Sequence, residues 1–329
     1  MARAAACDHG RLPSTGERTI TRVTDPHAVT TAYRLSMLEV DTLTRRFGEI
    51  VAVDEATFAV PGGQMTGFVG GNGAGKTTAM RMIVGVLGIT AGEVRWHGRP
   101  ITAEDRRGFG YMPEERGLYP KQGVLDQLVY LGELGGMTAP AARRSVMDHL
   151  ERFGLADRAK DKVEKLSLGN QQRVQIIAAV MREPSCLILD EPFSGLDPHA
   201  VDAMADLLRE HTARGTPVLF SSHQLDLVER LCDRLVILKA GRVVASGSTS
   251  ELEASESRRY RLTVAGDAGW TRDVPGIHVV DVDGGSALFE IETAGAEQQL
   301  LRAATGHGDV LEFSPVRPSL SEIYREVTQ

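Results

Sequence analysis

The spacing of hydrophobic positions changes several times along this chain, and each change predicts a new element. Short, continuous apolar runs bounded by turn residues are typical of strands that are buried on both faces of a parallel sheet. Such runs occupy residues 65–70, 186–190, 217–222 and 234–239. We therefore predict a parallel sheet at the centre of the main domain. A turn at 239–242 folds the last of these strands into a hairpin.

Other runs predict a second sheet and the helices that surround the first. Runs typical of strands in a small antiparallel sheet occupy 38–43, 56–60 and 93–98. Within 123–134 the apolar residues follow the spacing of a helix, and 141–155 continues as a second helix. The apolar positions of the first helix are Val124, Leu125, Leu128, Val129 and Leu131. This mixture predicts an α/β fold for residues 37–250.

The pattern after residue 250 predicts a second, smaller domain. Residues 251–258 are charged and weakly patterned, and we interpret them as a linker. Beyond them we predict an α+β domain at 259–329. Its expected strands and helices are 260–266, 277–284, 287–293, 296–306 (helix), 309–315 and 320–327 (helix).

Residues 1–36 show neither a strand nor a helix period. They carry five arginines against three acidic residues, and they lack the apolar segment of a secretory signal. Three interpretations stay open: a disordered leader, a start codon assigned too early, and an acid-poor transit peptide. Met37 opens a clean strand, which favours the second interpretation.

Composition narrows the functional class. The chain has 329 residues, of which 42% are hydrophobic and 25% charged, as in ordinary globular proteins of two domains. A net charge of −7 argues against a general nucleic-acid-binding surface. Three scattered cysteines indicate neither a disulfide framework nor a zinc site. No apolar run approaches the roughly 18 residues that cross a bilayer, so work at a membrane would need a partner chain.

The segment GGNGAGKTT (70–78) carries the clearest chemistry. It fits the pattern G-x-x-x-x-G-K-[ST], follows a predicted strand and precedes a helical run, which is the context that a phosphate-binding loop needs. Backbone N–H groups at a helix N-terminus attract phosphate, Lys76 would reach the β- and γ-phosphates of ATP, and the Thr77 hydroxyl would bind Mg²⁺. The predicted ATP-binding residues are Gly70, Gly71, Asn72, Gly73, Ala74, Gly75, Lys76, Thr77 and Thr78.

Two acids follow the apolar run 186–189. Asp190 comes at the end of a predicted buried strand, where a carboxylate would hold Mg²⁺ through water. Glu191 is next to it and would orient and polarise the attacking water as a general base. The alternative for Asp190 is a simple turn residue at the end of a strand.

Together with these residues, further motifs resemble the ATP-binding cassette (ABC) ATPases over residues 38–250. LSLGN (166–170) resembles the family's signature, SGLD (194–197) its D-loop, and His223 its switch histidine. The resemblance implies that Phe47 stacks on adenine, that His223 bonds the γ-phosphate, and that Asp197 connects two sites across a dimer. Phe47 could also be a core residue, and Asp197 a helix cap.

The signature of this family completes the site of a partner cassette. The resemblance therefore implies that Ser167 and Gly169 donate hydrogen bonds to ATP held by a second copy. Leu168 and Asn170 stand where the family has glycine and glutamine. Since Ser167 and Gly169 are retained, we expect the signature to work. A capped helix start is compatible with the same residues.

Glu114 stands where the family's Q-loop has glutamine, in the segment YMPEERGLYP (111–120). A carboxylate is a harder, charged Mg²⁺ ligand, so Thr77, Asp190 and Glu114 form the expected metal set. The alternative is a surface loop that couples by its shape alone.

The resemblance implies a parallel-sheet core, an antiparallel β subdomain and a helical subdomain at about 115–165, followed by the C-terminal α+β domain. The segment from Pro318 to Tyr324 resembles the accessory domain of ABC-2-type exporter ATPases. The alternative is an ordinary docking helix, which the apolar spacing of Leu320, Ile323 and Tyr324 fits equally. We expect an ATP-hydrolysing subunit that uses Mg²⁺, pairs with itself or a related subunit, and drives a separate transmembrane permease from the cytoplasmic face of the plasma membrane. The alternative is a soluble ABC ATPase without a transport role.

Overall fold

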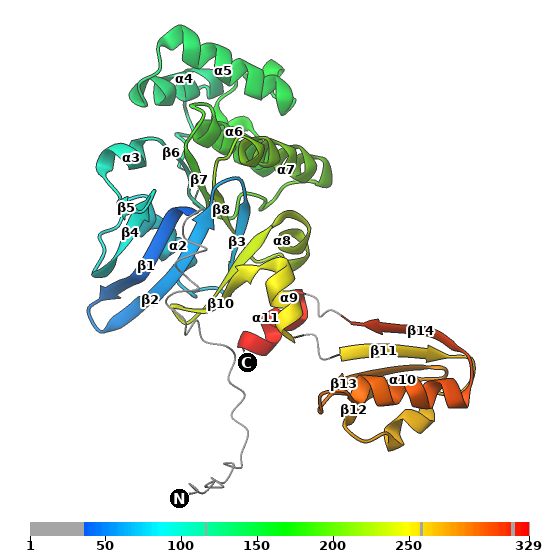
Figure 1. Ribbon diagram of the computed structural model, residues 1–329. Coiled ribbons are helices and arrows are strands. Elements are labelled where there is room, and N and C mark those ends of the chain that lie inside the picture. The colour runs from blue at the N-terminus through cyan, green and yellow to red at the C-terminus, as the bar shows by residue number, and fades with distance from the viewer. Residues whose placement is uncertain (1–35, 116, 257–258, 317–319, 329) are drawn as a thin grey trace, which may run out of the picture.

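The computed structural model of the chain describes residues 36–115, 117–256, 259–316 and 320–328. The interpretations of residues 1–35 lie outside this range. Three sheets organise the described residues, as Figure 1 shows. No described helix is long and apolar enough to cross a membrane.

The central sheet has six strands in the order β10-β9-β3-β8-β7-β6. All neighbours are parallel except β10, which pairs antiparallel with β9, so the predicted parallel core and its final hairpin are confirmed. The strands are β3 (Met65–Gly70), β6 (Phe109–Met112), β7 (Cys186–Leu189), β8 (Val218–Ser222), β9 (Arg234–Lys239) and β10 (Arg242–Ser248).

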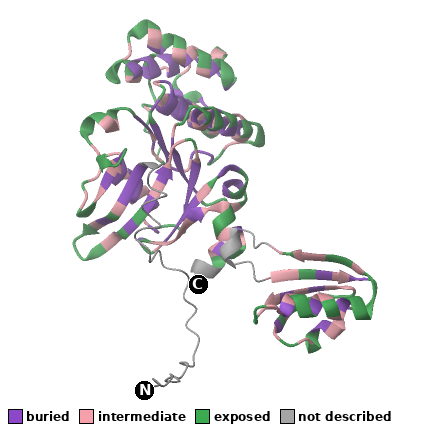
Figure 2. Ribbon diagram, in the orientation of Figure 1, coloured by how far each residue is buried: buried purple, intermediate pink, exposed green. Residues whose placement is uncertain are grey.

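Both faces of the central sheet are buried, and side chains alternate between two cores. Leu187 and Phe220 pack toward the helices on one face, whereas Ile188 and Leu219 pack toward the antiparallel sheet on the other. Apart from β10, Figure 2 shows these strands as the most continuously buried part of the cassette. The two-sided burial explains why continuous apolar runs predicted these strands.

The predicted antiparallel sheet is present and has the order β2-β1-β4-β5, although β1 and β2 are longer than the predicted runs and β5 was not predicted. Its strands are β1 (Ser36–Phe47), β2 (Ile50–Pro61), β4 (Ala91–Trp96) and β5 (Arg99–Pro100). The helix α2 (Lys76–Ile83) packs with this sheet through Met80 and Ile83, whose side chains are fully buried.

The remaining helices of the main domain are α3 (Ala103–Arg107), α4 (Val124–Leu134), α5 (Ala139–Arg152), α6 (Leu168–Val180), α7 (Pro198–Ala213), α8 (Leu225–Leu231) and α9 (Thr249–Glu256). Most of them pack against the other core, although α3 buries no residue there. The helices α4 and α5 lie within the range expected for the helical subdomain. The helix α9 corrects the linker prediction for 251–258, because most of that segment is helical and only 257–258 lie outside the described residues.

The third sheet has the order β12-β13-β11-β14 and, with α10, a core of its own centred on Leu262, Phe289 and Leu300. Its elements are β11 (Arg259–Val264), β12 (Ile277–Asp283), β13 (Ser286–Ile291), α10 (Ala296–His307) and β14 (Val310–Pro315). These are the predicted elements of the C-terminal α+β domain. The last helix, α11 (Leu320–Thr328), instead packs against α8 and α9.

Candidate active site

The phosphate-binding loop connects the end of β3 to the start of α2. Gly75 caps the helix with φ 105°, a conformation that favours glycine. A β-carbon on Gly75 would lie 2.5 Å from the carbonyl oxygen of Ala52, so the close approach also excludes any side chain. The N-terminus of α2 therefore presents its backbone N–H groups without obstruction, as an anion site requires.

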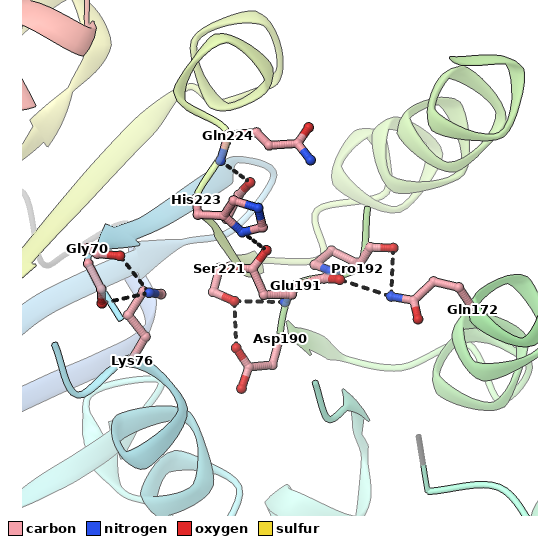
Figure 3. Close-up of polar contacts among 11 residues, drawn as sticks. Gly70, Lys76, Gln172, Asp190, Glu191, Pro192, Ser221, His223 and Gln224 are labelled. Carbon is pink, nitrogen blue, oxygen red and sulfur yellow. Dashed lines mark hydrogen bonds and ion pairs between the residues drawn. The ribbon is translucent and has the colours of Figure 1, made fainter. Parts of the chain in front are cut away.

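Lys76 is the first residue of α2 and is only 9% exposed. Its ammonium group donates hydrogen bonds to the carbonyl oxygens of Gly70 (2.6 Å) and Gly71 (3.3 Å), as Figure 3 shows. A buried cation needs such partners. The same loop therefore holds the charge close to where a triphosphate would lie.

Asp190 directly follows β7 and is 1% exposed. Its Oδ1 accepts a hydrogen bond of 2.6 Å from the Ser221 hydroxyl, whereas its buried Oδ2 has no partner. A buried, unpartnered carboxylate oxygen beside a phosphate loop fits a Mg²⁺ ion or one of its waters.

Glu191 has a backbone φ of 52°, which is rare outside glycine. Its N–H donates to Ser221 Oγ (2.8 Å), and its Oε2 lies 2.9 Å from Nδ1 of His223. Ser221 thus joins both acids. Burial raises the pKa of the Glu191 carboxyl, and His223 and Lys76 oppose that rise. A carboxylate with a raised pKa, held at a strained turn, suits proton transfer.

These side chains border one cavity of about 580 Å³. Its lining comprises Ala52, Asn72, Gly73, Ala74, Gly75, Lys76, Thr77, Thr78, Glu114, Asp190, Glu191 and His223. The carboxyl ends of β3, β8 and β7 are neighbours in the sheet, which explains the convergence. The predicted phosphate, metal and base residues thus border one cavity, except for Gly70 and Gly71.

Phe47 is not part of this lining. It lies at the turn between β1 and β2, is 46% exposed, and carries the Arg45 guanidinium 4.5 Å above its ring. The exposure argues against a core role. Stacking on adenine stays a prediction.

The signature residues are not part of the lining either. Ser167 caps α6 by accepting a hydrogen bond from the Asn170 N–H (3.3 Å), and Leu168 is 59% exposed. A β-carbon on Gly169 would come within 3.0 Å of the Gly195 carbonyl oxygen, so glycine lets the signature pack against the D-loop. Asp197 caps α7 through the Ala200 N–H (3.0 Å) and pairs with Arg173 (2.7 Å).

Two glutamines on α6 escaped the sequence analysis, as did Ser221. Gln172 donates to the carbonyl oxygens of Glu191 (2.9 Å) and Pro192 (3.1 Å). Gln175 donates to that of Pro113 (2.5 Å), next to Glu114. Both side chains are 4% exposed. For Gln175 the available signal was an amide in an otherwise apolar stretch, because buried amides need partners, whereas Gln172 stands between polar residues and gave no such signal.

Comparison with known proteins decides the family. Residues 53–194 match the ABC transporter family, and residues 247–328 match the C-terminal domain of DrrA1-3-like ATP-binding proteins. The chain is 41% identical over 292 residues to the uncharacterized ABC transporter ATP-binding protein YhaQ of Bacillus subtilis (strain 168), covering 88% of this chain and 98% of that protein. The chain belongs to the ABC transporter ATP-binding proteins.

Two further relatives of this ABC protein bear on its fold and role. A solved structure described as the ATP-binding subunit of an ABC transporter matches with a TM-score of 0.62 and 33% identity, over 67% of this chain and 92% of that one. The Nod factor export ATP-binding protein I of Paraburkholderia xenovorans (strain LB400) is 37% identical over 222 residues, covering 67% of this chain and 73% of that protein. The cassette fold, ATP hydrolysis and a transport role are therefore established, against the soluble alternative.

Proposed function

We propose that two copies of this chain, or one copy and a related subunit, close head to tail on two ATP molecules and drive an exporter. The observation that carries this proposal is the separation of the signature from its own cavity. Ser167 is exposed and Leu168 is 59% exposed, yet neither borders the phosphate cavity of its own chain. A facing copy would bring those groups to the ATP.

Within each site, the residues divide the reaction between them. Lys76 and the backbone N–H groups of 73–77 bind and orient the phosphates, and Glu191 accepts a proton from the attacking water. His223 bonds the Glu191 carboxylate and borders the phosphate cavity, which supports a bond from its imidazole to the γ-phosphate. Mg²⁺, when bound, would neutralise phosphate charge. Thr77, Asp190 and Glu114 would hold it, and the place of Glu114 in the lining supports its role as a ligand rather than a surface residue.

The power stroke comes from differential affinity. ATP favours the closed pair and its hydrolysis favours the open one, so the chemical step shifts a population of conformations. We propose export as the direction of transport because relatives of this chain are named for export and for resistance to linearmycin.

The permease would dock beside the helical subdomain. A groove there is lined by Leu118, Pro120, Val163, Glu164, Gln171 and Gln175, and Tyr119 beside it is 62% exposed. Exposed aromatic residues are enriched at protein interfaces. Docking of a membrane partner here would place the chain peripherally on the cytoplasmic face of the plasma membrane.

Light scattering of the full chain tests the paired site. Glu191→Gln protein should be monomeric alone and dimeric with ATP. Adding Ser167→Arg should abolish the dimer but leave single-site ATP affinity within about twofold, because Ser167 does not border its own cavity. A wild-type chain that keeps its full specific ATPase rate at a dilution where light scattering finds monomers only would overturn the proposal.

A further inference from the structure

The last helix of the chain returns to the cassette after the accessory domain. Leu320 and Ile323 of α11 are 2% and 1% exposed, and they belong to the same apolar core as Val228 of α8. In Figure 1 α11 lies beneath α8 and α9, and it contacts both. Burial of these two apolar side chains favours the docked position of α11.

The helix that receives α11 starts close to the switch histidine. His223 directly follows β8, and α8 begins at Leu225. The Gln224 N–H between them donates to Ser222 Oγ (3.0 Å), which keeps this connection short and ordered. A shift of α8 would therefore move His223, which is the hydrogen-bond partner of Glu191.

The helix α11 also comes close to the phosphate loop. A β-carbon placed on Gly71 would lie 3.7 Å from the Tyr324 hydroxyl, an ordinary contact distance. The carbonyl of Gly71 accepts hydrogen bonds from Lys76 (3.3 Å) and from the Ala74 N–H (3.1 Å). Tyr324 therefore borders the peptide that holds the phosphate-binding lysine in place.

We propose that Tyr324 is a positioning residue of the nucleotide site. Docking of α11 would then affect the phosphate loop through Tyr324 at Gly71, and the switch histidine through α8. Coupling of this kind is reciprocal: if docked α11 favours nucleotide, bound nucleotide must favour docked α11 by the same factor. The proposal requires nucleotide binding only, and neither a dimer nor a permease, so it stands or falls separately from export.

Calorimetric titration of the full chain with Mg·ADP tests the proposal. Tyr324→Ala should weaken ADP binding about threefold to tenfold and raise KM for ATP with kcat nearly unchanged. Tyr324→Phe keeps the ring and should lose about twofold. Arg325→Ala is the matched control, because Arg325 is exposed on the same helix and its side chain bonds only the Ser321 carbonyl among the contacts described.

Hydrogen exchange supplies the reciprocal measurement. In the wild-type chain, Mg·ADP should slow amide exchange in 320–328 several-fold, and Tyr324→Phe should reduce that effect while α11 stays docked. Unchanged ADP affinity in Tyr324→Ala, or exchange in α11 that ignores ADP, would overturn the proposal. If the alanine variant does not fold, the phenylalanine variant decides the question by the same two measurements.

Discussion

The imidazole Nδ1 of His223 lies 2.9 Å from Oε2 of Glu191, although 32 residues separate them in sequence. The contact joins the residue that would accept a proton to the residue that would detect phosphate. Glu191→Gln keeps the shape but removes the base. We expect ATP turnover to fall about 100-fold or more while ATP still binds, measured by phosphate release and by equilibrium binding. Turnover that stays near the wild-type rate would remove Glu191 from the proposed role.

The same pair predicts a pH dependence of turnover. The base must be ionised, and burial raises the pKa of Glu191 above its ordinary 4.5. Activity should therefore fall with decreasing pH at a higher pH than an exposed glutamate would give. His223 lowers that pKa, so in His223→Gln the acid limb of the residual rate should move to higher pH. A limb that stays in place, or moves to lower pH, contradicts the assignment.

Ser221 should matter for both acids. Ser221→Ala removes the donor to Asp190 Oδ1 and the acceptor for the Glu191 N–H, leaving two buried groups without partners. We expect a loss of about 1–3 kcal/mol in unfolding free energy and a higher Mg²⁺ concentration for half-maximal turnover. Ser222→Ala is the comparison, because Ser222 is equally buried but bonds the Gln224 N–H. Ser222→Ala should lower stability without altering the Mg²⁺ dependence of turnover. The same Mg²⁺ dependence in both variants would contradict a specific role of Ser221 at Asp190.

Gln175 should hold the Glu114 loop in place. Gln175→Leu removes the hydrogen bond to the Pro113 carbonyl, so amide exchange in 113–120 should quicken about threefold to tenfold. Gln171→Leu removes similar bonds, but to the carbonyls of Val163 and Leu166. It should leave exchange in 113–115 unchanged. Equal effects of the two variants on exchange in this loop would show that the hydrogen bond from Gln175 does not specifically stabilise it.

Much of the fold was predictable because the central strands are buried on both faces. Residues 65–70 and 234–239 form strands with the predicted bounds. A short continuous apolar run between turn residues is typical of a strand buried on both faces. The strand β6 escaped prediction because FGYM is short and contains glycine. The helix α9 was taken for a linker because its sequence, TSELEASE, is charged and weakly patterned.

The residues of the site likewise fall into a predictable group and an unpredictable group. Lys76, Asp190, Glu191 and His223 belong to local motifs, so their convergence at neighbouring strand ends could be predicted. Gln172 and Ser221 act on groups 19 to 31 residues away. A periodic pattern indicates that a residue is buried, but it does not indicate which distant carbonyl group will be its hydrogen-bond partner. The nearness of Tyr324 to Gly71, 253 residues away in sequence, is visible only in the structure.

Stability should depend on one histidine outside the site. His211 on α7 is 3% exposed, and its Nδ1 accepts a hydrogen bond from Arg214 (3.2 Å). Burial, helped by Arg214 and His149, lowers its pKa from 6.5 to about 4. The unfolded chain therefore takes up a proton below pH 6.5 that the folded chain refuses until about pH 4. Stability is lost as pH falls through this window, by up to about 1.4 kcal/mol per pH unit from this group.

Urea unfolding at pH 7.5, 6, 5 and 4.5 measures this contribution. His211→Gln should flatten the decline in stability, by roughly 3 kcal/mol across the whole window, because glutamine takes up no proton. His199→Gln is the matched control, since His199 lies on the same helix but is exposed. Its decline should follow the wild-type curve. Parallel curves for wild type and His211→Gln would mean that His211 titrates alike in the folded and unfolded chains, contrary to its burial.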